Sequence, residues 1–217
     1  MNTERALFNM VEQQIRTWNV LDLQVLGHLA RLDRQLFVPK AFASLAYSDT
    51  EIPLGHGECM LAPRVEARLL QDLKLQAHER VLEIGTGSGY LTALLALSCA
   101  QVLSLECHAD LVDMAQHNLS HAGIRNAEVR LSQGVPHGLN DAAFDAMVLG
   151  GSVAEVPSEL LNLLKPHGRL VAVVGDEPMM QATRITRQAD GSGHSQVLWD
   201  VVTPRLHGFA EHSSFHF

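Results

Sequence analysis

The sequence has no apolar run long enough to cross a bilayer, and it has few aromatic residues, 5% of its 217. A membrane-spanning helix needs about 20 consecutive apolar residues, so we expect no membrane partner. An excess of basic residues is also missing, because the formal net charge is -8. Surfaces that bind nucleic acid are usually basic. The composition therefore argues against a nucleic-acid partner as well.

Cysteine is scarce, and its spacing is typical of neither a metal site nor a disulfide framework. Cys59, Cys99 and Cys107 form no Cys-x-x-Cys pair, and the histidines form no His-Glu-x-x-His motif. We therefore expect no bound metal. The first residues also lack the basic-then-apolar layout of a secretory signal peptide. Together with the odd number of cysteines, this predicts a reducing, cytoplasmic location.

What is present is enough apolar sequence for one large domain. Hydrophobic residues make up 47% of the chain, and 217 residues suit a single domain over 1–217. We divide it into an N-terminal extension of helices and a substrate loop, residues 1–78, and a core of alternating elements, residues 79–217. No feature of the sequence predicts an oligomeric state.

The core alternates short apolar runs with helical patterns. The predicted strands cover residues 81–84, 102–105, 128–131, 144–149 and 169–174, and Gly150-Gly151 is expected to end the fourth. Strands that alternate with helices imply right-handed crossovers and a mostly parallel sheet. Asp190-Gly191 then predicts a hairpin turn. The fold class is therefore α/β: a Rossmann-like, doubly wound sheet, with N-terminal helices and a C-terminal antiparallel hairpin.

A glycine loop joins the first of these strands to a helix. It consists of Gly85, Thr86, Gly87, Ser88 and Gly89, and glycines are needed where a backbone turns sharply and a ligand comes close. The spacing differs from the Gly-x-Gly-x-x-Gly of dinucleotide enzymes. Glu83 lies two residues before the loop, where a carboxylate suits a positively charged ligand group. These features favour S-adenosylmethionine over NAD as the cofactor.

Two further strand ends carry candidate cofactor-binding residues. Glu106 ends the second strand about 20 residues after the loop, where a carboxylate accepts hydrogen bonds from ribose hydroxyls. Gln133 and Gly134 follow the third strand, and the Gln133 amide suits the adenine amino edge. The carboxyl ends of parallel strands meet at one edge of a sheet. The alternative is a set of ordinary turns, but the combination favours a cofactor site.

The glycine loop with its strand, residues 82–90, is accompanied by more specific segments. These are Met10-Val11-Glu12-Gln13-Gln14-Ile15-Arg16, Phe37-Val38-Pro39, Ile52-Pro53-Leu54-Gly55-His56-Gly57 and Leu164-Lys165-Pro166-His167-Gly168. In these residues the chain resembles the protein-L-isoaspartate O-methyltransferase family, over nearly its whole length. The resemblance implies an S-adenosylmethionine-dependent enzyme of protein repair that methylates the free carboxylate of L-isoaspartyl residues.

The sequence departs from that family in the substrate loop, Gly57, Glu58, Cys59, Met60 and Leu61. The resemblance implies threonine at position 59 and serine at position 61, with hydroxyls that serve the active site. It also implies aspartate at position 133 and a shorter ending than Pro204 to Phe217.

Losing these hydroxyls removes hydrogen-bond donors rather than a base. A carboxylate acceptor has a pKa near 4 and is already ionised at neutral pH, so positioning is the main requirement. The catalytic residues are therefore unknown. Arg64 is a tentative candidate, since a guanidinium binds a carboxylate through two hydrogen bonds. The favoured alternative for Arg64 is a solvated residue in the first turn of a helix.

Two functional hypotheses follow. The first is a working methyltransferase that acts on a carboxylate of isoaspartyl protein or peptide, or on another acceptor. The second is a family member that binds S-adenosylmethionine, has lost the chemistry and serves regulation or assembly.

Overall fold

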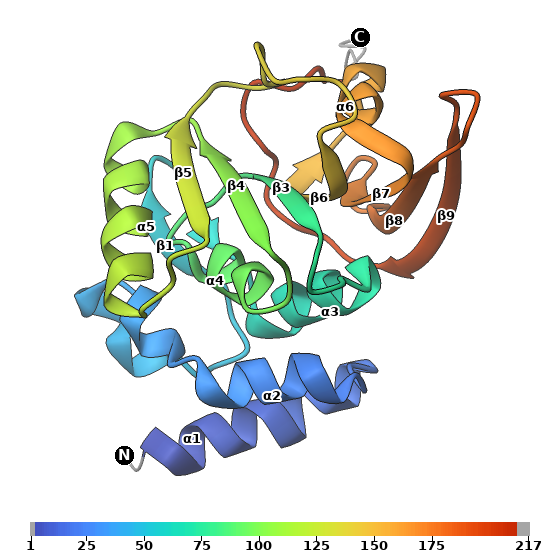
Figure 1. The fold of residues 1–217 in the computed structure, drawn as a ribbon. Helices are drawn as coiled ribbons and strands as arrows, with labels where there is room; N and C mark the ends of the chain where they lie inside the picture. The colour runs from blue at the N-terminus through green and yellow to red at the C-terminus, as the bar shows by residue number, and fades with distance from the viewer. Residues whose placement is uncertain (1–2, 212–217) are drawn as a thin grey trace, which may run out of the picture.

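A mostly parallel sheet forms the centre of the computed structural model, which describes residues 3–211. Its strands are β3 (Arg80–Ile84), β4 (Gln101–Glu106), β5 (Ala127–Leu131), β6 (Phe144–Val153), β7 (Leu164–Val174), β8 (Gln181–Arg187) and β9 (Gly193–Asp200). They lie in the order β5-β4-β3-β6-β7-β8-β9 (Figure 1). The pairs from β5 to β7 are parallel, and β8 and β9 are antiparallel. The predicted sheet and hairpin are confirmed.

Helices cover both faces of this sheet. They are α3 (Pro63–Leu73), α4 (Tyr90–Ala96), α5 (Ala109–His121) and α6 (Ser158–Leu163). Neighbouring strand residues point to opposite faces, so Val81 packs in the cluster that holds α3, α4 and α5. Leu82 packs in the second cluster, with Leu160 of α6. Apolar side chains on both faces explain why the strands are short apolar runs, and the doubly wound arrangement is confirmed.

The N-terminal elements pack on the side of the sheet that carries α3 and α4, below the sheet in Figure 1. They are α1 (Thr3–Asn9), a π-helix (Met10–Ile15), a 3-10 turn (Arg16–Trp18), α2 (Leu23–Arg31), two 3-10 turns (Arg34–Phe37, Lys40–Leu45) and the hairpin β1 (Ile52–Gly55) and β2 (Glu58–Met60). Met10, Ile15 and Leu29 are fully buried in the same cluster as Leu94 of α4. The extension and the sheet therefore share one core.

Strand β6 does not end at Gly150-Gly151, as the sequence predicted, but continues to Val153. Its register with β7 shifts between Val148 and Ser152. A Cβ on Gly150 would lie 2.3 Å from the carbonyl oxygen of Gly85. The glycines therefore let an irregular strand pass close to the glycine loop instead of stopping it, as glycine in a strand often does.

The segment after β9, red in Figure 1, returns to the carboxyl end of β6. The Ser152 backbone N–H donates to the Pro204 carbonyl (2.8 Å), and the Leu206 N–H donates to the Ser152 carbonyl (2.9 Å). The last part of the tail singled out in the sequence, residues 212–217, lies outside the described residues.

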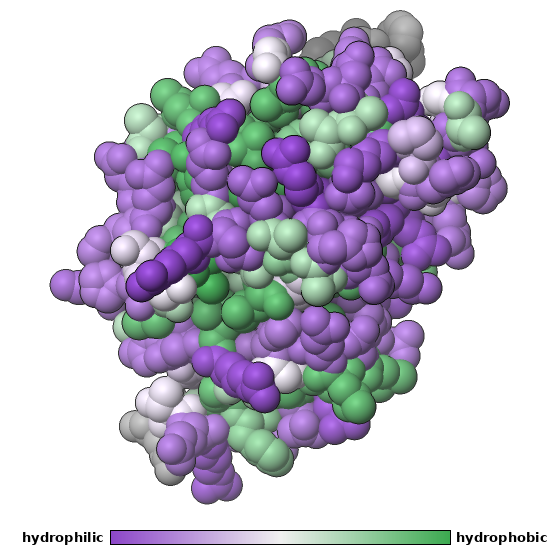
Figure 2. All heavy atoms as spheres, viewed as in Figure 1, coloured by the Kyte–Doolittle hydropathy of each residue, from purple (hydrophilic) through white to green (hydrophobic). Residues whose placement is uncertain are grey.

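The outside of the molecule is largely polar in the view of Figure 2, with smaller hydrophobic patches between hydrophilic residues. Within residues 3–211, no helix combines the length and the apolar composition that crossing a membrane requires.

Candidate cofactor and acceptor site

The glycine loop takes a backbone conformation that side chains disfavour. Gly85, Gly87 and Gly89 have φ of 90°, 53° and 87°, in the left-handed region that glycine adopts without steric cost. A Cβ on Gly89 would lie 3.3 Å from Ala115 of α5. The Gly85 N–H donates to the Leu105 carbonyl at the end of β4 (2.8 Å). The sequence spacing of these glycines thus reflects real conformational needs.

Glu106 is fixed at the end of β4 by backbone donors. Its Oε2 accepts a hydrogen bond from the Gly87 N–H (2.9 Å), and its Oε1 accepts from Cys107 (2.8 Å) and His108 (3.1 Å). Hydrogen bonds to a charged acceptor are about twice as strong as neutral ones. The carboxylate is therefore held in one orientation beside the glycine loop.

Two cavities are lined in part by the glycine loop. The first is lined by Gly85, Gly87 and Gly150, by Glu58 and Cys59 of β2, and by Glu106, Cys107, Ser132, Gly134, Leu206 and His207. The second is lined by Cys59, Met60, Leu61, Glu66, Thr86 and Ser88, with Gly85, Gly87 and Gly150 shared. The fold thus brings together most of the predicted site residues. Gly57, Glu83, Gly89, Gln133 and Arg64 line neither cavity.

The C-terminal segment fills part of this groove. The first cavity encloses about 40 Å³, whereas ligand pockets usually enclose roughly 300 Å³ or more. A Cβ on Gly85 would lie 2.7 Å from Cδ2 of Leu206. With Leu206 and His207 in place, the space beside Gly85 is therefore smaller than a nucleoside-sized cofactor needs.

Glu83 lies beneath the glycine loop rather than in a cavity. It is fully buried, and its Oε2 accepts hydrogen bonds from the hydroxyls of Thr92 (2.5 Å) and Ser104 (2.6 Å). Its Oε1 has no hydrogen-bond partner among the described residues. Burial raises the pKa of Glu83 to about 7, and the two hydroxyls act against that rise. Its predicted contact with a positively charged cofactor group stays a prediction.

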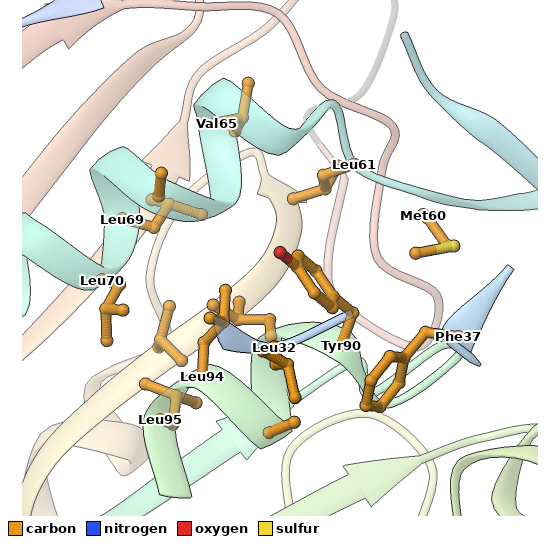
Figure 3. Packing of buried hydrophobic residues seen from close by; sticks show 14 of the residues in the cluster. Leu32, Phe37, Met60, Leu61, Val65, Leu69, Leu70, Tyr90, Leu94 and Leu95 are labelled. Atoms are coloured by element: carbon orange, nitrogen blue, oxygen red, sulfur yellow. The ribbon is translucent and has the colours of Figure 1, made fainter. Parts of the chain in front are cut away.

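The substrate loop rests on a buried ion pair that sequence reasoning missed. Arg34 is fully buried, pairs with Glu66 of α3, and donates from Nη2 to the Leu61 carbonyl (2.7 Å). Its guanidinium also lies 4.5 Å from the centroid of the Tyr90 ring. Figure 3 shows Leu61 close to that ring. Burial raises the pKa of Glu66 to about 7, and Arg34 opposes the rise.

The sequence held one signal of this pair. Glu66 stands between the apolar residues Val65 and Ala67 in a helix whose other inner positions are apolar, and all three are buried. A buried carboxylate needs a partner, but Arg34 lies 32 residues away.

Arg64 lies in the first turn of α3, as the sequence predicted, but its guanidinium is already engaged. Nη1 lies 2.5 Å from Oδ2 of Asp49, and the guanidinium carbon lies 4.5 Å from the centroid of the Trp18 ring. The tentative catalytic role of Arg64 stays a prediction.

The sequence model of one family matches residues 5–203, and its description is Protein-L-isoaspartate(D-aspartate) O-methyltransferase (PCMT). The chain belongs to this family. A protein-L-isoaspartate O-methyltransferase of Methanoculleus marisnigri is 38% identical over 82% of this chain and 81% of its own length. One of Myxococcus xanthus is 42% identical over 72% of this chain and 74% of its own length.

A solved structure has the same fold and supports the cofactor. A Plasmodium falciparum chain, assigned to the same activity and crystallised with S-adenosyl-L-homocysteine, is 25% identical. The similarity has a TM-score of 0.79 and covers 96% of this chain and 99% of that chain. The protein is thus an S-adenosylmethionine-dependent methyltransferase, and the predicted cofactor is confirmed. The glycine loop and the Glu106 carboxylate on the cavity wall fit this group.

Proposed function

We propose that the protein transfers a methyl group from S-adenosylmethionine to the free carboxylate of L-isoaspartyl residues in a protein or peptide. The observation that carries the proposal is the position of the β2 segment, residues 58–61, opposite the glycine loop. Cys59 lines both cavities, and Met60 and Leu61 line the second. An acceptor bound by this segment would meet the cofactor beside the glycine loop, whose Gly85 and Gly87 line both cavities. Family membership over residues 5–203 supports the same acceptor.

The reaction asks this chain for positioning rather than proton transfer. S-adenosylmethionine supplies a methyl group on a positively charged sulfur, and an isoaspartyl carboxylate is ionised at neutral pH. We assign the ribose hydroxyls to Glu106 and the close backbone approach to Gly85 and Gly87. The β2 segment then orients the acceptor, and alignment of this kind can supply several kcal/mol of the barrier, up to about 11.

The side chain of Cys59 provides a hydrogen-bond donor in the substrate loop. Burial raises the pKa of its thiol to about 12, with Glu51 adding to the rise. The thiol therefore keeps its proton at neutral pH and can donate a weak hydrogen bond, to Glu51 as the structure stands and to an acceptor carboxylate once one is bound. We propose that Cys59 fills the role that the family resemblance gives to threonine.

A second candidate function is cofactor binding without methyl transfer to isoaspartate. It is favoured by Leu61, which is buried and offers no donor to the second cavity, and by Arg64, which is engaged by Asp49 and Trp18. A carboxylate that loses water without gaining donors is costly to bury.

The test is transfer of labelled methyl from S-adenosylmethionine to an isoaspartyl peptide, beside the same peptide with ordinary aspartate. We expect label on the isoaspartyl peptide alone. Calorimetric binding of S-adenosylmethionine without label on either peptide would replace the first proposal with the second.

We also propose a cytoplasmic location and the division into residues 1–78 and 79–217. The free state of Cys59, Cys99 and Cys107 supports a reducing compartment.

A further inference from the structure

A cluster of possible metal ligands lies at the edge of the first cavity. It contains Glu58 of β2 and the consecutive residues Cys107 and His108 after β4. A carboxylate oxygen, the Cys107 Sγ and a His108 ring nitrogen lie within 4.8 Å of one another. These residues come from chain segments far apart in sequence, which is why spacing rules did not find them.

His108 carries the most informative atom of this cluster. Its Nε2 is buried and has no hydrogen-bond partner among the described residues. It lies 3.6 Å from Oε1 of Glu58, which is too far for a hydrogen bond. Two ligands at about 2.1 Å from a tetrahedral zinc ion would themselves be about 3.4 Å apart. The observed separation therefore suits a shared cation better than a direct contact.

A second imidazole approaches from the C-terminal segment. His207 Nε2 lies 3.2 Å from the same Glu58 oxygen. The His108 ring is held in place because it stacks on His56 with centroids 4.2 Å apart, and His56 is bonded to Asp110 (2.8 Å). This stacking restrains the orientation of the His108 ring.

The charges around the cluster also favour a cation. Two carboxylates, Glu58 and Glu106, line the cavity at whose edge the cluster lies. Within residues 3–211, no lysine or arginine forms an ion pair with Glu58. A divalent ion displaces the thiol proton when it binds, and it would neutralise the crowded acids at the same time.

We propose that Glu58, Cys107 and His108 form a three-ligand binding site for a divalent transition-metal ion of the zinc type, with the fourth position open. A mixed set of oxygen, sulfur and nitrogen ligands suits zinc and cobalt rather than magnesium or calcium. Glu58 and Cys107 also line the cofactor cavity. An ion bound between them would tie β2 to the residues that follow β4 at the cavity wall, so it partly closes the groove and slows cofactor entry.

The test uses cobalt(II) alone as the probe, added to the reduced full chain. We expect one equivalent to bind and to give the near-ultraviolet charge-transfer band of a cobalt–thiolate bond. The band disappears in Cys107→Ser and persists in the matched controls Cys59→Ser and Cys99→Ser. Absence of the band in the wild type, or its persistence in Cys107→Ser, overturns the proposal.

Two further variants test whether loss of the band reflects loss of a ligand rather than loss of the fold. His108→Ala should weaken cobalt binding at least as much as loss of an outer-shell partner, about tenfold or more. His207→Ala changes an exposed side chain outside the ligand set and should leave the cobalt affinity within a few-fold of the wild type. Unchanged affinity in His108→Ala contradicts the ligand set.

The effect on the cofactor is measured separately, as the rate of S-adenosylmethionine association with and without saturating zinc. Zinc should slow association in the wild type and leave it unchanged in Cys107→Ser. Equal rates in the wild type contradict the closure of the groove. This readout does not depend on the methyl acceptor, so it stands or falls apart from the proposed function.

Discussion

The two halves of the site are built in different ways. The donor half, residues 83–89 with Glu106, relies on backbone: left-handed glycines and three N–H groups that fix one carboxylate. The acceptor half, residues 57–64, relies on a few side chains that stand over the buried Arg34–Glu66 pair. Backbone geometry tolerates few substitutions, whereas a loop side chain can change without refolding. We therefore expect substitutions of loop side chains in the acceptor half to disturb the fold less than substitutions of the glycines in the donor half.

The largest effect is expected from the support of the acceptor half. Arg34→Met leaves Glu66 buried without its cation, and breaking a buried pair from one side typically costs about 3–5 kcal/mol of unfolding free energy. Arg34→Met with Glu66→Leu should recover most of that loss. Urea unfolding of the wild type and both variants measures this. A single variant within about 1 kcal/mol of the wild type would show that the pair does not support the loop.

Within the donor half, Glu106 should contribute strongly to the affinity for S-adenosylmethionine. Glu106→Ala removes two charge-assisted hydrogen bonds to the ribose, each worth about 1.5 kcal/mol or more, so we expect at least about 100-fold weaker S-adenosylmethionine binding. Calorimetry gives the affinity, and thermal unfolding separates it from loss of fold. Affinity within a few-fold of the wild type, in a folded variant, would mean that another group holds the ribose.

Glu83 should make the stability of the folded protein depend on pH. Its pKa is raised from 4.5 to about 7, so between these values the folded protein binds a proton that the unfolded chain has released. Its contribution to stability therefore falls as pH rises through this window. Glu83→Gln removes the contribution, and its unfolding free energy should decline less steeply from pH 5 to 7. Parallel curves for the two proteins would contradict the raised pKa.

Leu61→Ser tests whether a hydroxyl in the acceptor half improves methyl transfer. It restores a hydroxyl, and one hydrogen bond to a charged acceptor is worth at least about 1.5 kcal/mol, so kcat/KM for an isoaspartyl peptide should rise about tenfold. Because Leu61 is buried, stability should fall by about 2 kcal/mol. Leu61→Ala is the matched control for the cavity. An equal rise in both variants would assign the gain to space rather than to the hydroxyl.

The smallest effect is expected at Arg64. Because Asp49 and Trp18 already engage its guanidinium, Arg64→Ala should lower stability by about 1 kcal/mol or less and leave kcat/KM within about threefold, under 1 kcal/mol. Methyl-transfer kinetics on the isoaspartyl peptide check this. A drop of more than about tenfold in kcat, with Arg64→Lys only partly active, would instead support the orienting role that the sequence predicted.

The parts that could be predicted from sequence are those coded by local pattern. Apolar runs predicted the strands, and the spacing of Gly85, Gly87 and Gly89 predicted the turn before α4. Glu106 was found because strand ends meet at one edge. The Arg34–Glu66 pair and the metal-ligand cluster join residues far apart in sequence, and no local pattern records such contacts.

The continuation of β6 was missed for a related reason. Gly150 is typical of the end of a strand, but here its lack of a side chain allows the Gly85 backbone to approach closely. The return of Leu206 to the groove depends on two backbone hydrogen bonds with Ser152, which any sequence can make.

The glycine loop is expected to hold the methyl donor, and the β2 segment is expected to hold the acceptor. A crystal structure with S-adenosylhomocysteine and an isoaspartyl peptide would show both contacts at once. We predict the ribose hydroxyls on Glu106, Leu206 moved away from Gly85, and the peptide carboxylate beside Cys59 and Leu61. A ribose away from Glu106, or a carboxylate bound away from the β2 segment, would contradict the account.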